Sequence, residues 1–494
     1  MKQSFPKEVF LIMDSLERSG YRAFLVGGCV RDLLLGKEPK DWDVTTNARP
    51  EEIQKLFPDS VYENEFGTVG VKTDSANPKT KVIEVTTFRI EGKYSDKRHP
   101  DQVQFAKTIE EDLSRRDFTI NAIAENFNGE IVDPYNGRAD LKNKIVRTVG
   151  DPKKRFEEDA LRLIRAVRFS VELGFSTQGG PASGWEIERE TALAIKEMAN
   201  LLEMIAKERI RDEFIKIIMA KDAAKGIITL EDLGLLRYVM PELREGIGCG
   251  QNKHHIYTVF DHNVRALNYT AEKNYSLPVR LASLLHDVGK PRTKAGDGPD
   301  STFYNHETVG ARMTLKILDR LRFSKELIEQ VAHLVRSHLF YYNVGEVTEA
   351  GVRRFLVRVG PENIDDLLKV READRIGSGV PKAFPYKLRH LLFMIEKVKT
   401  DPIHPKMLKV DGEDIMKFLN ISPGPKIGYV LAILLEEVLD DPKKNEREYL
   451  ESRAKILGVL SDNELEKFSR KAHEKKEEFE GGVERGMKEK YHVK

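Results

Sequence analysis

The strand-like segments of this chain are confined to its first 150 residues. Between about Tyr21 and Val149, runs rich in β-branched and aromatic residues, such as YRAFLVGG, DWDVTT, GTVGVKT and KVIEVTTF, alternate with polar turns and helical segments. After Asp151, apolar residues recur at helical spacing instead, as in EEDALRLIRAVRFSVELGF. The pattern predicts an α+β protein with a small mixed sheet at its beginning and helices throughout the rest.

Composition sets limits on size, location and partners. A chain of 494 residues has room for about three domains, and 40% hydrophobic with 33% charged residues is typical of a soluble globular protein. No segment resembles a bilayer span or a cleavable signal, so we expect a cytoplasmic protein without a membrane partner. The net charge of +1 means that any nucleic acid must be held by local basic patches. The two cysteines, Cys29 and Cys249, predict neither a disulfide framework nor a thiolate metal site.

A double glycine separates the first strand-like run from a helical segment. Gly27 and Gly28 leave backbone N–H groups uncovered, and the helix VRDLLLGK directs its N-terminus to the same place, which suits a triphosphate. Arg31 adds a permanent charge whose forked donors match phosphate oxygens, and Asp32 can orient it. Taken alone, the glycine pair also fits an ordinary tight turn.

Two aspartates follow in DWDVTT. Strand alternation predicts that Asp41 and Asp43 share one face, with Trp42 turned into the core. Their carboxylates repel one another unless a cation lies between them, and Mg²⁺ both prefers oxygen ligands and bridges nucleotide phosphates. Glu84, on the strand KVIEVTTF, is a candidate third carboxylate. An isolated Asp-x-Asp is more often a polar surface strand, but the glycine pair just upstream favours a catalytic metal site.

Four motifs in order along the chain, GGCVRD, DWDVTT, RRDFTINAIA and RFEEDALRLIRAVRF, resemble the class II tRNA nucleotidyltransferase and bacterial poly(A) polymerase family. The resemblance implies that Asp41 and Asp43 hold Mg²⁺ and that Arg116 with Asp117 approaches phosphate or ribose. It implies a nucleotide-binding set of Gly27, Gly28, Arg31, Asp32, Arg116, Asp117, Asn121, Asp159, Arg162, Arg165 and Arg168.

Asp159 and Arg162 offer a physical basis for base selection. They lie three residues apart on a predicted helix, which makes their side chains neighbours. Cytosine and adenine present an amino donor beside a ring-nitrogen acceptor, and this edge matches a carboxylate beside a guanidinium. Uracil and guanine would leave groups unpaired, at about 1–3 kcal/mol for each buried one. The alternative is a set of surface ion pairs worth about 0.3–0.5 kcal/mol each. Apolar residues on the other side of the helix favour base selection.

The helical half contains FDHNVRAL, LLHDVGKPRT, NHETVGA, VRSHLF and READRIG. A lone histidine on a helix is more often a core or surface residue than a ligand, but this order of histidines and aspartates resembles the HD phosphohydrolase superfamily. Such a set is suited to one or two divalent transition metals, such as Mn, Ni, Co or Fe, and to phosphoester hydrolysis. Lys290 and Arg292 are candidate phosphate ligands, and His254 and His255 remain unassigned. The expected metal ligands are His262, His286, Asp287, His306, His338 and Asp374.

We therefore predict a catalytic head (1–150), a helical neck with a nucleotide-selecting helix (151–245), an HD-type helical domain (246–395) and an RNA-binding tail (396–494). The expected reaction adds CCA, or only its terminal A, to the tRNA 3′ end from CTP and ATP. The polar segment 89–105 resembles the flexible loop of family members that add the terminal A, and Lys426 is a candidate RNA contact. A poly(A) polymerase of the same family and an HD phosphohydrolase with an RNA-binding head remain alternatives. The oligomeric state and the substrate of the HD site stay open.

Overall fold

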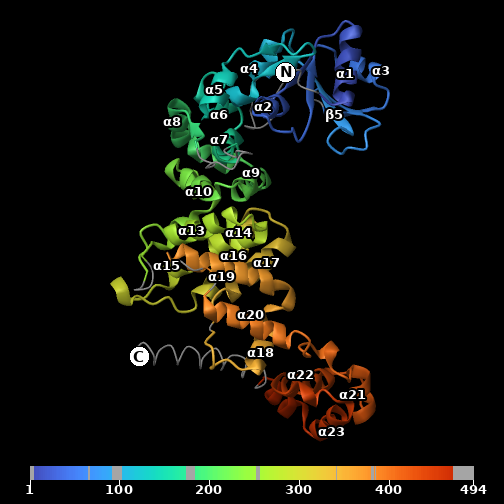
Figure 1. Cartoon of the computed structure of the whole chain (residues 1–494), viewed down its shortest axis with the longest axis vertical. Coiled ribbons are helices and arrows are strands. Elements are labelled where there is room, and N and C mark those ends of the chain that lie inside the picture. The colour runs from blue at the N-terminus through green and yellow to red at the C-terminus, as the bar shows by residue number, and fades with distance from the viewer. Residues whose placement is uncertain are drawn as a thin grey trace.

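The computed structural model describes residues 5–64, 67–91, 103–173, 184–251, 256–340, 342–379, 383 and 385–470. Within these residues the molecule is elongated, with the head at one end and the C-terminal helices at the other (Figure 1). A seven-stranded sheet lies in the head and helices predominate after it, which confirms the α+β class. Most of the predicted loop (92–102), His254, His255 and the chain from residue 471 onward lie outside the described residues.

The head is built on a mixed sheet in the order β3-β4-β5-β2-β1-β8-β9. Its strands are β1 (Ala23–Val26), β2 (Asp43–Thr46), β3 (Ser60–Asn64), β4 (Thr68–Lys72), β5 (Val82–Thr87), β8 (Ala124–Asn126) and β9 (Ile131–Val132). Only β2 and β5 pair in parallel within this sheet as described. The apolar strand β1 is buried along its whole length, so the residues that follow it are held at a fixed position.

Short helices and a two-stranded ribbon surround this sheet. The helices are α1 (Lys7–Arg18), α2 (Gly28–Leu34), α3 (Pro50–Leu56), α4 (Ile109–Ser114) and α5 (Gly137–Asn143), and the ribbon pairs β6 (Arg89–Glu91) with β7 (Val103–Phe105). The side chain of Trp42 is buried in the core, as its position between two polar residues predicts. Strand β2 begins at Asp43, so Asp41 lies just before the strand rather than on it.

The neck contains α6 (Pro152–Glu158), α7 (Leu161–Glu172), α8 (Arg189–Met198), α9 (Lys207–Met219), α10 (Ala223–Asp232), α11 (Leu236–Val239) and α12 (Pro241–Arg244). Helix α7 is central: ten of its twelve residues are buried, and it packs against α9 and α10. Because α7 is enclosed in this way, its polar side chains need partners inside the protein.

Two expectations about the neck are wrong. The single helix predicted to carry both Asp159 and Arg162 is divided into α6 and α7, because Asp159 has an extended backbone (φ −139°, ψ 104°). Short polar side chains compete for backbone N–H groups, which favours such an interruption. The region after Asp151 is also not wholly helical, since β11 (Glu186–Ile187) pairs in parallel with β10 (Ile145–Val146) of the head.

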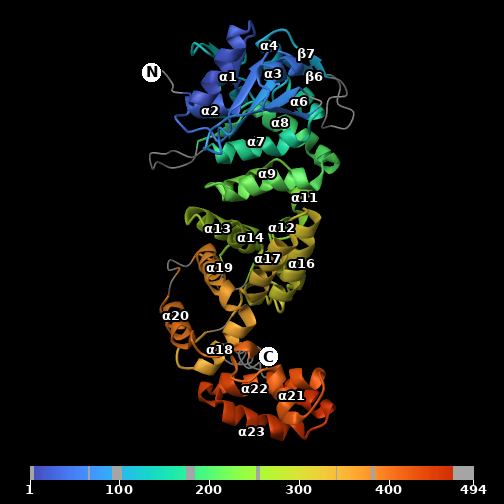
Figure 2. The same ribbon diagram turned by 90° about the vertical axis from the view of Figure 1, so that its right-hand side faces the viewer.

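Residues 259–398 contain α13 (Val259–Glu272), α14 (Leu277–Leu285), α15 (Lys290–Thr293), α16 (His306–Arg320), α17 (Lys325–Ser337), α18 (Glu349–Val359), α19 (Ile364–Gly377) and α20 (Tyr386–Val398). The tail contains α21 (Gly412–Leu419), α22 (Pro425–Asp440) and α23 (Arg447–Gly458) (Figure 2). One hydrophobic core continues from the head into the HD domain, whereas the tail has a core of its own. No helix of the described residues is long and apolar enough to cross a membrane.

Arg280 joins the neck to the HD domain. Its side chain is buried in α14, and Nη1 donates to the carbonyls of Ile218 and Ala220 at 2.9 Å each. These carbonyls end α9, and its last carbonyl groups have no partner within the helix. The guanidinium therefore satisfies a helix end of the neck from inside the HD domain.

Candidate active site and candidate metal centre

Two predicted metal ligands lie opposite one another on the head sheet. Asp43 on β2 is in register with Glu84 on the parallel neighbour β5. Asp41 and Glu84 are exposed, whereas Asp43 is half-buried. Burial raises the pKa of the Asp43 carboxyl, the nearby Arg116 guanidinium opposes this shift, and the Asp41 charge adds to it. A group of carboxylates that repel one another is a suitable donor set for a hard divalent cation.

The glycine turn lies beside these acids. Gly27 has φ 77° and donates its N–H to the Ile123 carbonyl at 3.2 Å. A Cβ atom at Gly27 would lie 2.6 Å from Nη1 of Arg116, so only glycine lets that guanidinium approach the turn. Because Arg116 also acts on Asp43, the structure brings the turn, the arginine and the acid to one place.

A chain of side-chain contacts connects the head to the neck. Arg31 donates to Asp32 at 2.9 Å and to Asn121 at 2.8 Å, and Asn121 donates to Asp117 at 3.0 Å. Arg165 of α7 donates to Oδ2 of Asp117 from Nε at 2.9 Å and from Nη2 at 2.5 Å. Burial opposes ionisation, but the Arg165 charge and the Asn121 amide hold the pKa of Asp117 well below its usual range. Five of the predicted nucleotide-binding residues are thus linked directly.

Phe169 is a residue of this site that sequence reasoning missed. The guanidinium groups of Arg31, Arg165 and Arg168 lie 5.3, 5.4 and 4.0 Å from the centre of its ring. Arg168 is also paired with Glu213 of α9 at 2.9 Å, so its side chain is directed toward that helix. The sequence feature that could have identified Phe169 is its position at the end of the fourth motif, RFEEDALRLIRAVRF. Sequence reasoning also missed Glu213, whose only signal is a carboxylate within the apolar pattern of a predicted helix.

The two predicted base-reading residues are held by separate contacts. Asp159 lies between α6 and α7, and its Oδ1 accepts from the Leu161 backbone N–H at 3.0 Å. Arg162, in the first turn of α7, donates to Glu158 at 2.7 Å and to the Arg115 carbonyl at 3.1 Å. The pair therefore does not share one helix face, although the Arg162 N–H donates to the Asp159 carbonyl at 3.0 Å.

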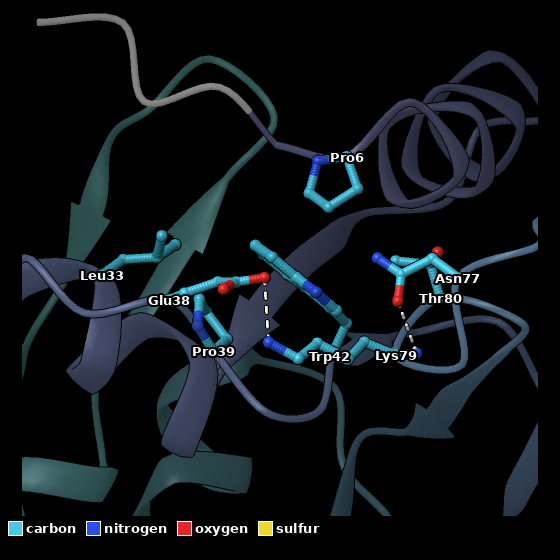
Figure 3. A pocket seen from close by; sticks show the side chains of 8 residues that line it. All are labelled: Pro6, Leu33, Glu38, Pro39, Trp42, Asn77, Lys79 and Thr80. Carbon is cyan, nitrogen blue, oxygen red and sulfur yellow. Dashed lines mark hydrogen bonds and ion pairs between the residues drawn. The ribbon is translucent and has the colours of Figure 1, made fainter.

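A hollow of about 270 Å³ lies next to Trp42 (Figure 3). Glu38 and Lys79 form an ion pair there at 2.9 Å. None of the predicted nucleotide-binding or metal-binding residues lines it, so it is separate from the active site. Its lining consists of Pro6, Leu33, Glu38, Pro39, Trp42, Asn77, Lys79 and Thr80.

The six predicted HD ligands converge in the helical half. They form two groups whose candidate ligand atoms lie within 4.8 Å of one another, namely His262 with His286 and Asp374, and Asp287 with His306 and His338. Asp287 links the groups, because its Oδ2 lies 3.2 Å from His262 Nε2 and its Oδ1 lies 3.4 Å from His306 Nε2. All six residues are at most 9% exposed. A buried cluster of imidazoles and carboxylates is a suitable donor set for transition metals.

Close packing and charge define this cluster further. A Cβ at Gly289 would lie 2.3 Å from the His306 carbonyl, so this glycine allows α15 to approach α16. Burial lowers the pKa of His338 to about 3, which leaves a neutral imidazole with a free lone pair. Burial opposes ionisation of Asp287, yet Lys290 and His286 hold its pKa well below the usual range.

Two basic residues near the cluster differ in their contacts. Lys290 Nζ lies 2.6 Å from Asp287 and donates to Gln251 at 2.7 Å. Arg292 instead pairs with Glu245 at 2.6 Å at the surface. Of these two residues, only Lys290 contacts a predicted metal ligand. In the tail, Lys426 donates to the Leu460 carbonyl at 2.8 Å, so its amine has a partner within the protein.

Family models match three parts of the chain. They are the poly A polymerase head domain (residues 23–147), a probable RNA and SrmB- binding site of polymerase A (184–247) and the HD domain (259–377). An A-adding tRNA nucleotidyltransferase of Deinococcus radiodurans is 35% identical over 84% of this chain and 91% of its own. A CCA-adding enzyme of a Geobacillus species is 33% identical over 93% of this chain and 99% of its own.

The chain belongs to the class II tRNA nucleotidyltransferase and poly(A) polymerase family, and it is a nucleotidyltransferase. The Bacillus stearothermophilus CCA-adding enzyme in complex with CTP has a similar structure, with a TM-score of 0.67 and 27% identity over 91% of this chain and 96% of its own. The Thermotoga maritima CCA-adding enzyme complexed with tRNA shares the fold, with a TM-score of 0.54 and 22% identity over 92% of this chain and 97% of its own. The resemblance stated from four motifs is confirmed, and the HD domain is part of this family member.

Proposed function

We propose that this nucleotidyltransferase completes the 3′ end of tRNA in the cytoplasm, adding CCA or its terminal A from ATP and CTP without a template. The observation that carries the proposal is the register of Asp43 with Glu84 beside the Gly27 turn and Arg116. A triphosphate bound at this place would lie close to backbone N–H donors, a guanidinium and carboxylates.

The acids are the groups that would hold Mg²⁺. Asp41, Asp43 and Glu84 offer oxygen donors only, as that ion prefers, and two of the three are exposed. When bound, Mg²⁺ would neutralise charge on the phosphates during transfer. The chain itself would supply the orientation: Arg31 and Arg116, beside the glycine turn, would face the phosphates, and Asp117 keeps Arg165 in place.

At the α-phosphorus of the nucleotide, the reaction forms one bond and breaks one. The 3′ oxygen of the RNA bonds to the α-phosphorus of the nucleotide, the bond from that phosphorus to the β-phosphate oxygen breaks, and pyrophosphate leaves. The hydroxyl proton passes to water. Asp159 and Arg162 would read the pairing edge of cytosine or adenine, because one accepts and the other donates.

Product length tests the proposal and separates its variants. Purified protein is incubated with tRNA that lacks the terminal triplet, and with tRNA that ends in CC, with CTP and ATP separately and together. A CCA-adding enzyme extends the first tRNA by three nucleotides, and an A-adding enzyme extends only the second, by one. A long tail from ATP alone would identify a poly(A) polymerase. Failure to extend either tRNA would contradict the proposal.

A second activity is supported by the buried HD cluster. We propose that His262, His286, Asp287, His306, His338 and Asp374 hold one or two divalent transition metals and that this site hydrolyses phosphoesters. When bound, such metals would activate water and polarise the ester. Lys290, which is positive and 8% exposed, would contact the phosphate. Metal analysis of the purified protein, with bis(p-nitrophenyl) phosphate as the probe substrate, tests this. A protein that neither retains metal nor cleaves the probe in Mn²⁺, Ni²⁺ or Co²⁺ would overturn it.

A further inference from the structure

Asp374, the last predicted ligand of the HD cluster, has an arginine partner on its own helix. Arg371 is the first residue of the motif READRIG and lies three residues before Asp374 on α19. Its Nη1 donates to Oδ2 of Asp374 at 2.5 Å. The side chain of Asp374 is 12% exposed and that of Arg371 is 26% exposed, so the ion pair lies at the border of the buried cluster.

The two carboxylate oxygens of Asp374 have different surroundings. Oδ2 accepts from Arg371, whereas Oδ1 lies 3.3 Å from Nε2 of His262 and 3.6 Å from Nε2 of His286. These two histidines and Asp374 form one of the two candidate ligand groups. Burial opposes ionisation of Asp374, but the Arg371 charge and hydrogen bonds from the histidines hold its pKa well below the usual range. The guanidinium therefore holds one oxygen and leaves the other close to the imidazoles.

The Arg371 side chain is also restrained by an aromatic ring. Its guanidinium carbon lies 5.7 Å from the centre of the Phe340 ring, and that ring lies 5.1 Å from the ring of Phe355. A guanidinium over an aromatic face gains a favourable cation–π interaction. Phe340 follows the predicted ligand His338 by two residues, so this contact joins the segment after α17 to α19. A carboxylate bound to a donor restrained in this way has little freedom to rotate.

We propose that Arg371 is a positioning residue of the HD metal centre: it holds Oδ2 of Asp374 so that Oδ1 is presented to a divalent metal together with His262 and His286. This inference rests on the metal binding proposed for the HD cluster, and it adds a residue that is not itself a ligand. Hydrogen-bond partners of metal ligands commonly contribute about 10- to 100-fold to metal affinity. A positive charge near a cation opposes its binding, so the sign of the effect separates orientation from charge alone.

The test is a titration of the metal-free full-length protein with Co²⁺, measured by calorimetry and by the visible absorption of the bound ion. Arg371→Gln removes the charge, and Arg371→Lys keeps the charge without the forked donors. Lys369→Gln is the matched control, because Lys369 lies on the same helix and also pairs with an acid three residues away, Asp366, at 2.9 Å. We expect Arg371→Gln to weaken Co²⁺ binding by about 10- to 100-fold, Arg371→Lys to weaken it less, and Lys369→Gln to resemble the wild type.

The number of affected ions separates positioning from a general distortion. In the part of the chain that the structure describes, Arg371 contacts no member of the second group, which consists of Asp287, His306 and His338. Where two Co²⁺ ions bind, only one affinity should therefore fall, and nucleotide incorporation should be unchanged. Equal loss at both ions would overturn the inference, as would an equal loss in Lys369→Gln.

The remaining outcomes separate this inference from the proposed HD activity. Unchanged or tighter Co²⁺ binding by Arg371→Gln would overturn the inference alone, because orientation of Asp374 would then contribute nothing to affinity. A lowered Tm with unchanged affinity would assign Arg371 to folding and would overturn it as well. A wild type that binds no Co²⁺ would refute the proposed HD activity and this inference together. If Arg371→Gln does not fold, Arg371→Lys carries the same test through its smaller loss of affinity.

Discussion

The two candidate metal sites of this molecule are built in opposite ways. In the head, Asp41 and Glu84 are exposed and the site offers oxygen donors at two inner strands of the sheet. In the HD domain, six side chains are enclosed by helices, four of them imidazoles, and none is more than 9% exposed. One site is open to a ligand that arrives with its own charge, and the other is already assembled within the core.

The difference predicts how readily each site exchanges its metal. Mg²⁺ dehydrates reluctantly and is commonly bound through a few carboxylates together with substrate phosphates. An open carboxylate group is therefore suited to an ion that exchanges at every turnover. Imidazole-rich sites favour transition metals, and burial slows their exchange. We expect the head to need free metal in the assay and the HD domain to retain its metal during purification.

The largest expected effect is on catalysis in the head. Asp43→Ala removes the half-buried acid that faces Glu84, and we expect kcat/KM for nucleotide incorporation to fall by about 1,000-fold or more, because metal stabilisation of a transition state is worth several kcal/mol. Incorporation of labelled ATP and CTP into tRNA measures it. The variant should keep the metal content of the HD domain. Turnover close to that of the wild type would remove Asp43 from the metal site.

The reciprocal substitution tests whether the two sites are independent. His286→Ala with Asp287→Ala removes one ligand from each HD group, and we expect bound transition metal and phosphoester cleavage to be lost. Nucleotide incorporation should stay within about threefold of the wild type, since the head contacts do not involve these residues. Equal loss of incorporation in a folded variant would show that the sites are coupled.

The sequence predicted more of the HD site than of the head. Its predicted ligands are carried by five spaced motifs, and the structure brings their candidate ligand atoms together in two groups. In the head, Asp41 and Asp43 could be found from their spacing, but the connection of Arg31 to Arg165 through Asn121 and Asp117 depends on the packing of α7 against the head. No local pattern contains such a long-range contact.

The break between α6 and α7 at Asp159 is a smaller example of a long-range contact that local sequence patterns do not contain. The apolar spacing of 155–169 is helical on both sides, so periodicity predicts one helix. The interruption depends on a side chain that accepts from Leu161 N–H and on Arg209, 50 residues later, which holds it. The backbone conformation at Asp159 thus depends on a local hydrogen bond to the backbone and on a distant ion pair. Only the local hydrogen bond could be anticipated from the sequence.

Chelation should separate the sites by stability. Dialysis against EDTA is expected to remove Mg²⁺ from the head without a change in Tm, and fresh Mg²⁺ should restore incorporation at once. Removal of the HD metal should lower stability by about 2.7 kcal/mol if the metal had been present at 100 times its Kd. For a domain of this size that corresponds to a Tm lower by about 5–10 °C. Unchanged Tm after complete loss of metal would argue that the HD cluster is stable without it.

The smallest effect concerns pH, and it applies to the head. Because burial raises the pKa of Asp43, protons compete with Mg²⁺ for this carboxylate as the pH falls. The Mg²⁺ concentration for half-maximal incorporation should therefore increase toward acid pH, by at most about tenfold per pH unit, and should be constant well above the raised pKa. Saturating Mg²⁺ should restore most of the rate, because proton and cation bind the same group. A loss of rate at low pH that saturating Mg²⁺ does not reverse would assign the titration to another residue, and the contrast between an open and an enclosed site would then rest on exposure alone.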